Sequence, residues 1–177
     1  MPTKFEVILG DITEQEVDAI VNAANESLGG GGGVDGAIHE AAGPEMTDEC
    51  LDLYGCPPGQ ARITGGYRLP AKYIIHTVGP VWRDGEHDED EILTACYRNC
   101  IHFAEMQGLK TLAFPCISTG AFGFPTERAC GVAVQVVRRV ISQGSSLELV
   151  RFVCFEHEDY VIYRRALAGI AEFPEED

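Results

Sequence analysis

Short apolar runs alternate with longer amphipathic segments along most of the chain. The apolar runs predict strands at 5–9, 19–24, 61–67, 73–78, 111–116 and 147–155. The amphipathic segments predict helices at 34–42, 44–53, 88–106, 126–141 and 160–171. This alternation predicts a three-layer α/β/α sandwich whose central sheet is mixed but largely parallel, with antiparallel strands near 61–78.

Local signals mark where several of these helices begin and end. Gly43 is a C-terminal stop, and Pro44 suits the first turn of the helix that follows it. The acidic first turn of the 88–106 helix complements the helix dipole. Thr126 is expected to cap the 126–141 helix with its hydroxyl.

Size and composition indicate one domain covering residues 1–177. The chain has 177 residues, of which 45% are hydrophobic. A chain of this size buries roughly 70% of the surface that its unfolded form exposes. The fold therefore needs no disulfide and no metal to hold it together.

The charge balance excludes several classes of partner. The formal net charge is −15, which repels nucleic acid phosphates and anionic membranes. No stretch reaches the ~18 apolar residues of a membrane span. Any phosphate bound here must be held by backbone N–H groups rather than by Lys or Arg. The acidic runs at 86–91 and 172–177 are interpreted as solvated surface.

The seven cysteines predict no metal centre, because none of them forms a Cys-x-x-Cys pair. Cys96 and Cys100 are one helical turn apart and are interpreted as small buried residues. Reduced thiols and the lack of an export signal point to the cytoplasm.

Two loops carry the candidate chemistry: the glycine loop (residues 25–33) and the serine loop (residues 118–123). Each follows the carboxyl end of a predicted buried strand and runs into a helix start. Ligands of open α/β sheets bind at such ends, and a helix N-terminus binds anions through free N–H groups. The five consecutive glycines at 29–33 let the backbone approach a ligand closely. The two loops therefore predict one pocket for a diphosphate-containing nucleotide.

A dinucleotide-binding fingerprint is the competing interpretation of the glycines. Gly31, Gly33 and Gly36 match its spacing after a strand and before a helix. However, the charge of Asp35 opposes a pyrophosphate there, and no acidic residue ends a strand about twenty residues later. A nicotinamide-dependent oxidoreductase is thus a weaker alternative, and the absence of Gly-Lys-Ser/Thr excludes a P-loop.

Four polar residues lie beside the glycine loop: Asn22, Asn25, Asp35 and His39. The two amides can orient sugar hydroxyls, or they can only stabilise turns. Asp35 is either a helix-dipole partner or a general base. His39 lies one helical turn beyond Asp35, where it can steady the carboxylate or contact a ligand.

Five segments together resemble the macrodomain signature over residues 5–168. They are Gly-Asp-Ile-Thr at 10–13, Val-Asp-Ala-Ile-Val-Asn-Ala-Ala-Asn at 17–25, Gly-Gly-Gly-Gly-Val-Asp-Gly-Ala-Ile-His at 30–39, His-Thr-Val-Gly-Pro at 76–80 with Trp82, and Pro-Cys-Ile-Ser-Thr-Gly-Ala-Phe-Gly-Phe-Pro at 115–125. The pattern is most similar to the MacroD-type branch, which includes bacterial O-acetyl-ADP-ribose deacetylases. Phe124 departs from it, because relatives often carry Tyr there.

The resemblance implies a set of ADP-ribose contacts. Asp11 would accept a hydrogen bond from the adenine amino group, with the Ile12 backbone beside it. The residues implied along the diphosphate and the distal ribose are Gly33, Val34, Asp35, Ser118, Thr119, Gly120, Ala121 and Phe122. Phe122 would lie against the distal ribose.

The resemblance also implies catalytic roles and an activity. Asn25 would orient the distal ribose, Asp35 would activate or position water, and Asn22 and His39 would support them. The implied reaction hydrolyses ADP-ribosyl esters without a cofactor or metal. The substrates would be O-acetyl-ADP-ribose or proteins mono-ADP-ribosylated on Glu or Asp. Whether the substrate's own phosphate positions the water stays open. The alternatives are a binding module that reads ADP-ribose without turnover and, less favoured, a poly-ADP-ribose glycohydrolase.

Overall fold

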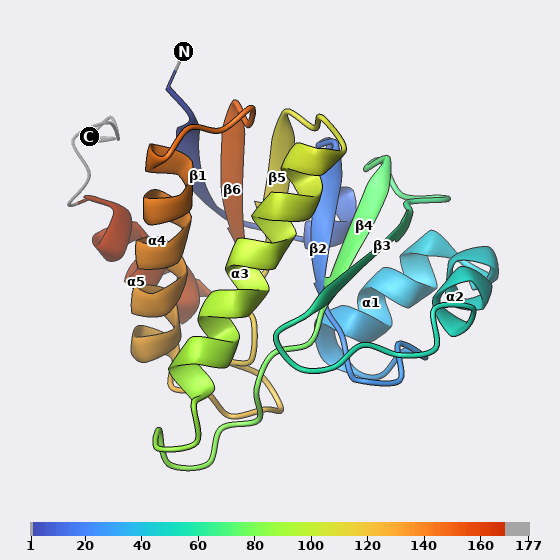
Figure 1. Cartoon of the computed structure of the whole chain (residues 1–177), viewed down its shortest axis with the longest axis horizontal. Helices are drawn as coiled ribbons and strands as arrows, with labels where there is room; N and C mark the ends of the chain where they lie inside the picture. The colour runs from blue at the N-terminus through green and yellow to red at the C-terminus, as the bar shows by residue number, and fades with distance from the viewer. Residues whose placement is uncertain (1, 169–177) are drawn as a thin grey trace.

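The computed structural model describes residues 2–168, and in them six strands form one sheet in the order β1-β6-β5-β2-β4-β3 (Figure 1). The strands are β1 (Lys4–Leu9), β2 (Ala19–Ala23), β3 (Ala61–Gly65), β4 (Tyr73–Thr77), β5 (Thr111–Phe114) and β6 (Leu149–Cys154). All neighbouring strands pair in parallel except β3, which is antiparallel to β4. The predicted mixed, largely parallel sheet is confirmed.

Helices cover both faces of this sheet. They are α1 (Gly33–Ala42), α2 (Pro44–Leu51), α3 (Glu89–Met106), α4 (Thr126–Ser142) and α5 (His157–Ala168), with a short 3₁₀ turn η1 (Ile12–Glu14) after β1. One apolar cluster joins α3, α4 and α5 to the sheet, and a second joins α1, α2 and η1 to its other face. The three-layer architecture predicted from the alternation of elements is therefore confirmed.

Side-chain alternation along β2 decides which residues face which layer. Ala19 and Val21 belong to the cluster under α3 and α4, whereas Ile20 belongs to the cluster under α1 and α2. Asn22, two residues after Ile20, therefore faces the α1 layer. This placement matters because α1 carries the candidate catalytic carboxylate.

Several predicted boundaries shift. β3 ends at Gly65, since Gly66 N–H turns to donate to Lys72 O at 2.8 Å. The last helix begins at His157 rather than at 160, and residues 169–171 of its predicted end lie outside the described residues. The predicted Thr126 cap is wrong, because Pro125 occupies the N-cap position and the Thr126 hydroxyl makes no capping bond.

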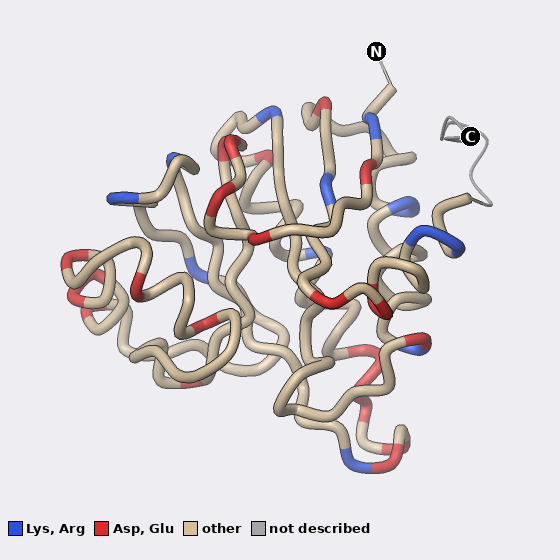
Figure 2. The backbone as a smooth tube through the Cα atoms, turned by 180° about the vertical axis from the view of Figure 1, so that it is seen from behind, with Lys and Arg blue, Asp and Glu red and all other residues tan. Residues whose placement is uncertain are grey.

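The interpretation of Cys96 and Cys100 as core residues is confirmed, whereas the interpretation of the acidic run at 86–91 is wrong at one position. Cys96 and Cys100 are completely buried and free, as expected of small core residues. Figure 2 shows the positions of Asp and Glu spread over several helices and loops of the chain. The solvated interpretation of the 86–91 run is wrong for Glu89, which is only 1% exposed. None of the helices in residues 2–168 has the length and apolar character needed to cross a bilayer.

Candidate functional site

The two candidate loops leave the sheet at a point where its connections diverge. After β2 the chain passes through α1 and α2 to β3 and β4 on one side, and after β5 it passes through α4 to β6 on the other. Because β2 and β5 are parallel neighbours, their loops start side by side and then separate. Open α/β sheets bind ligands in the crevice that such a divergence creates. A cavity of about 300 Å³ lies there, between the glycine loop and the serine loop.

The glycine loop is held by the side chain of Asn25. Its Nδ2 donates to Gly30 O at 2.9 Å, and its Oδ1 accepts from the Ser27 hydroxyl at 2.8 Å. Gly30 and Gly33 have φ angles of +95° and +58°, which residues with a side chain rarely adopt. Asn25 therefore shapes the loop as well as lining the cavity.

The start of α1 presents free N–H groups to the cavity. The first helical bond runs from Gly36 N–H to Gly32 O at 3.2 Å, so the three preceding N–H groups have no partner inside the helix. These N–H groups belong to Gly33, Val34 and Asp35, all of which line the cavity. Gly36 allows the loop to pack against the helix, because a Cβ at this position would collide with the carbonyl oxygen of Gly31.

The serine loop forms the opposite wall. Ser118 has a φ of +68°, and its carbonyl accepts from Phe124 N–H at 2.9 Å, which closes the loop. Among the described residues, nothing accepts a hydrogen bond from the N–H groups of residues 120–122. Ser118, Gly120, Ala121 and Phe122 line the cavity, whereas the Thr119 hydroxyl turns to donate to Cys116 O.

The loop at 81–88, between β4 and α3, supports the serine loop from outside. Trp82 N–H donates to Phe122 O at 2.8 Å, and the Trp82 ring packs on Phe124 with 4.8 Å between centroids. Arg128 lies over the Trp82 ring at 4.9 Å and is paired with Asp90. The buried ring of Phe124 thus joins the serine loop to Trp82 of the 81–88 loop.

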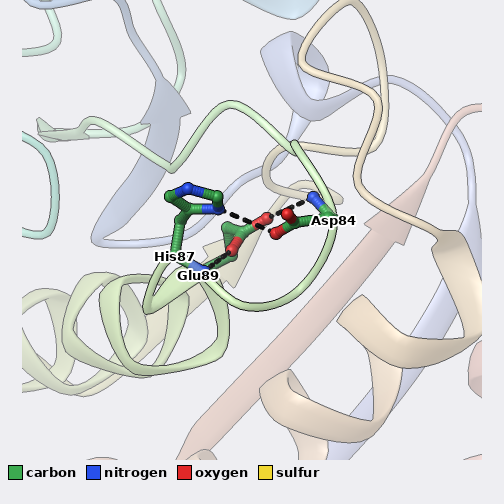
Figure 3. A group of neighbouring side chains, drawn as sticks. All are labelled: Asp84, His87 and Glu89. Carbon is green, nitrogen blue, oxygen red and sulfur yellow. Dashed lines mark hydrogen bonds and ion pairs between the residues drawn. The ribbon is translucent and has the colours of Figure 1, made fainter.

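Glu89 organises that loop from its buried position. Its carboxylate accepts the backbone N–H groups of Arg83, Asp84, Gly85 and His87 at 2.6–3.2 Å. Figure 3 shows the Glu89 carboxylate turned toward Asp84 and the backbone of His87. Asp84, His87 and Glu89 bring potential metal-ligand atoms within 4.8 Å of one another, but these hydrogen bonds already account for their arrangement.

Glu89→Gln is expected to lower the Tm at neutral pH, by removing a contribution to folding stability that disappears in acid. Burial alone raises the pKa of Glu89, but the four N–H bonds outweigh it and lower the pKa from 4.5 to about 2. The unfolded chain therefore binds more protons between these values, so the Glu89 contribution is present above pH 4.5 and is lost toward pH 2. The gap in Tm between wild type and variant, followed by circular dichroism, is expected to shrink as pH falls through this window.

Glu91→Gln is the matched control for that experiment, because Glu91 is an exposed acid in the same first turn of α3. A Tm gap for Glu89→Gln that stays constant from pH 7 to pH 3 would contradict the assigned role of the carboxylate.

Asp35 lies on the cavity wall, is only 6% exposed, and is the residue that contacts both Asn22 and His39. Its Oδ1 accepts from Asn22 Nδ2 at 2.9 Å and lies 3.3 Å from His39 Nε2. The other nitrogen of His39, Nδ1, is 2.8 Å from the Thr47 hydroxyl. Oδ2 lies beside Gly31, another residue of the cavity wall. The sequence-predicted residues Asn22 and His39 thus lie behind Asp35 rather than in the cavity wall.

Asp11 and Ile12 lie at the same edge of the sheet but outside the cavity wall. Asp11 Oδ1 caps η1 by accepting from Thr13 N–H at 2.9 Å and from its hydroxyl at 2.6 Å. Gly10 N–H donates to Cys154 O at 2.9 Å, so the ends of β1 and β6 are joined there. The next residue is Phe155, which is 73% exposed and which no sequence motif singled out as a candidate ligand contact. An aromatic residue directly after an apolar strand was the available signal.

A larger, shallower hollow of about 730 Å³ lies between residues 58–60 and the first turns of α3. Its lining includes the carboxylates of Asp88, Asp90 and Glu91 and, among the described residues, Arg98 as the one basic side chain. Carboxylates repel a diphosphate, and this hollow has no glycine-rich loop beside a helix N-terminus. The chemistry therefore favours the cavity at the strand ends.

A family model described as Macro domain matches residues 21–133 of the chain. The chain belongs to the Macro domain family. A macro domain-containing protein of Methanosarcina mazei is 54% identical over 94% of this chain and 89% of its own length. The O-acetyl-ADP-ribose deacetylase 1 of Pantoea vagans is 51% identical over 93% of this chain and 98% of its own length.

Solved macrodomains share the whole fold. A mutant Oceanobacillus iheyensis macrodomain with ADPR has a TM-score of 0.91 and 40% identity, with 97% of this chain and 95% of that one covered. A Trypanosoma brucei macrodomain in complex with ADP-ribose has a TM-score of 0.87 and 41% identity, with 92% and 68% covered. The macrodomain resemblance inferred from the sequence motifs is confirmed.

Proposed function

We propose that this macrodomain binds ADP-ribose and hydrolyses its esters, releasing acetate from O-acetyl-ADP-ribose. The observation that supports the proposal is the buried carboxylate of Asp35, whose Oδ1 is held by Asn22 while Oδ2 lies beside Gly31 of the cavity wall. A carboxylate that only stabilised the helix N-terminus would not need the contacts that Asn22 and His39 make with Oδ1. Relatives about half identical to the chain bear the name of this deacetylase activity.

Backbone N–H groups would hold the diphosphate. The first turn of α1 and residues 120–122 of the serine loop offer them from opposite walls, and the helix adds a partial positive charge. None of the described residues that line the cavity is Lys or Arg. This arrangement suits a chain of net charge −15, because the attraction for phosphate is confined to the cavity.

The adenine would lie at the ends of β1 and β6. Asp11 uses Oδ1 to cap η1, so Oδ2 is left to accept from the adenine amino group. The exposed ring of Phe155 offers a flat apolar surface against which the base would stack. In this orientation the diphosphate spans the cavity, and the distal ribose reaches Asp35, Asn25 and Phe122.

The proposed reaction is a water attack on the acyl carbon. Asp35 Oδ2 takes one proton from the water as its oxygen bonds to the acyl carbon. The bond from that carbon to the ribose oxygen then breaks, and the ribose oxygen receives the proton. The products are ADP-ribose and acetate. A protein Glu or Asp ester-linked to ADP-ribose contains the same acyl carbon, so it is proposed as the second substrate class.

Incubation of the protein with O-acetyl-ADP-ribose, and separately with glutamate-linked mono-ADP-ribosylated protein, tests this function. Chromatography is expected to show ADP-ribose accumulating from at least the acetylated substrate. Calorimetry with ADP-ribose, run beside it, separates binding from turnover. Tight binding without release at stoichiometric enzyme would replace the hydrolase by a binding module. Tight binding of NADH would revive the oxidoreductase alternative.

A further inference from the structure

His76 lies in the interior and shares Asn22 Nδ2 with Asp35, the proposed catalytic carboxylate. It is completely buried on β4 and is the register partner of Asn22 on β2. Ile74, two residues before it, belongs to the apolar cluster under α1 and α2, so His76 faces the same layer. It does not line the cavity. His76 therefore cannot contact a ligand in the cavity, and any effect that it has on the site is exerted through the residues that it contacts.

The hydrogen bonds around His76 allow only one tautomer. Asn22 Nδ2 lies 3.1 Å from His76 Nδ1, and an amide nitrogen only donates. Nδ1 must therefore accept, and the ring proton sits on Nε2. That nitrogen is 2.9 Å from the Thr64 hydroxyl, which itself donates to Gly65 O at 3.1 Å. In the hydrogen-bonded chain from Asn22 through His76 to Thr64, each donor thus has an acceptor.

The surroundings keep the ring neutral. Burial, with a smaller effect from the nearby His39, lowers the pKa of His76 from 6.5 to about 3. A second titratable group near the ring is Cys50, whose Sγ lies 3.7 Å from Nε2. Burial raises the pKa of that thiol to about 12, so it also stays neutral. His76 is thus a fixed acceptor facing Asn22 at physiological pH.

Two acceptors, Asp35 Oδ1 and His76 Nδ1, together hold the Asn22 amide in one orientation. One N–H of Nδ2 bonds to His76 Nδ1 and the other bonds to Asp35 Oδ1. Rotating the amide by half a turn would place its oxygen against a ring lone pair and a carboxylate oxygen together. The amide keeps its orientation although its own Oδ1 is buried without a partner among the described residues.

We propose that His76 is a positioning residue for the hydrolysis, acting through Asn22 to fix Asp35 Oδ1 so that Oδ2 faces the cavity. The inference rests on the proposed function and adds to it a residue that never touches the substrate. The Thr64 hydroxyl, which accepts the hydrogen bond from His76 Nε2–H, is the last member of the hydrogen-bonded chain Asp35–Asn22–His76–Thr64.

His76→Leu and His76→Asn test the proposal as a pair. Leu removes the acceptor, and kcat for O-acetyl-ADP-ribose is expected to fall about 10- to 100-fold, the scale for a displaced catalytic group. ADP-ribose affinity is expected to stay within about threefold, because the cavity wall is unchanged. Asn places an oxygen near the former Nδ1, so His76→Asn is expected to recover most of kcat.

Three results would overturn the positioning role. They are a wild-type kcat in His76→Leu, an equal loss of kcat in both variants, and a loss confined to ADP-ribose affinity. A wild-type protein that binds ADP-ribose and releases nothing would instead overturn the proposed function, and this is measured before any variant. Nitrogen-15 NMR of the wild-type ring needs no variant to fold. It is expected to show a neutral ring protonated on Nε2 from pH 5 to pH 8, and an Nδ1–H tautomer or titration in this range would overturn the inference.

Discussion

Asp35→Asn is expected to lower kcat for O-acetyl-ADP-ribose by about 10²- to 10⁴-fold, the usual contribution of a general base. The amide has the shape of the carboxylate and can still accept from Asn22 Nδ2, but it takes no proton from water. ADP-ribose affinity is expected to stay within about tenfold, because the N–H groups of the two loops remain. Single-turnover release of ADP-ribose, with calorimetry on the same preparations, measures both quantities.

Glu40→Gln is the control for this substitution, since Glu40 is an exposed acid on the same helix. It should leave both quantities unchanged. If Asp35→Asn hydrolyses the ester at the parent rate, the carboxylate is not the base, and the substrate's own phosphate takes its place in positioning the water.

Gly36→Ala is expected to abolish binding by displacing the glycine loop. The added Cβ would meet the carbonyl oxygen of Gly31, which is backbone and has no flexible end to move aside. Forcing the loop away from α1 separates it from the serine loop. ADP-ribose affinity is expected to fall at least about 100-fold, or ~2.7 kcal/mol. The free energy of unfolding is expected to fall by about 1–3 kcal/mol, as for other overpacked sites.

Gly131→Ala provides the matched control, because a Cβ at this exposed helical position meets nothing within 4 Å. It is expected to leave binding unchanged and to stabilise the helix by about 0.5–1 kcal/mol. Unchanged ADP-ribose affinity in Gly36→Ala would show that the glycine loop does not need its close packing against α1.

The fold and the two loops were predictable because their signals are local. The apolar runs and amphipathic stretches give the order of strands and helices, and parallel strands bring their carboxyl ends to one edge. The glycine loop and the serine loop therefore had to meet once β2 and β5 were neighbours. Asp35 and His39 were expected to interact from their helical spacing alone.

The remaining features depend on contacts that the sequence does not encode locally. Glu89 stands in an acidic run typical of surface, and its partners are backbone N–H groups that exist only once the loop has folded. His76 meets Asn22 because of the register between β2 and β4, which no pattern in either strand specifies. Thr126 failed as a cap because Pro125 took the N-cap position.

A crystal structure of Asp35→Asn soaked with O-acetyl-ADP-ribose tests the central claim most directly. We expect the diphosphate between the α1 N-terminus and residues 118–122, with the acyl group of the distal ribose within hydrogen-bonding distance of a water held by residue 35. Density for the nucleotide in the hollow between residues 58–60 and α3, or a ribose turned away from α1, would contradict it.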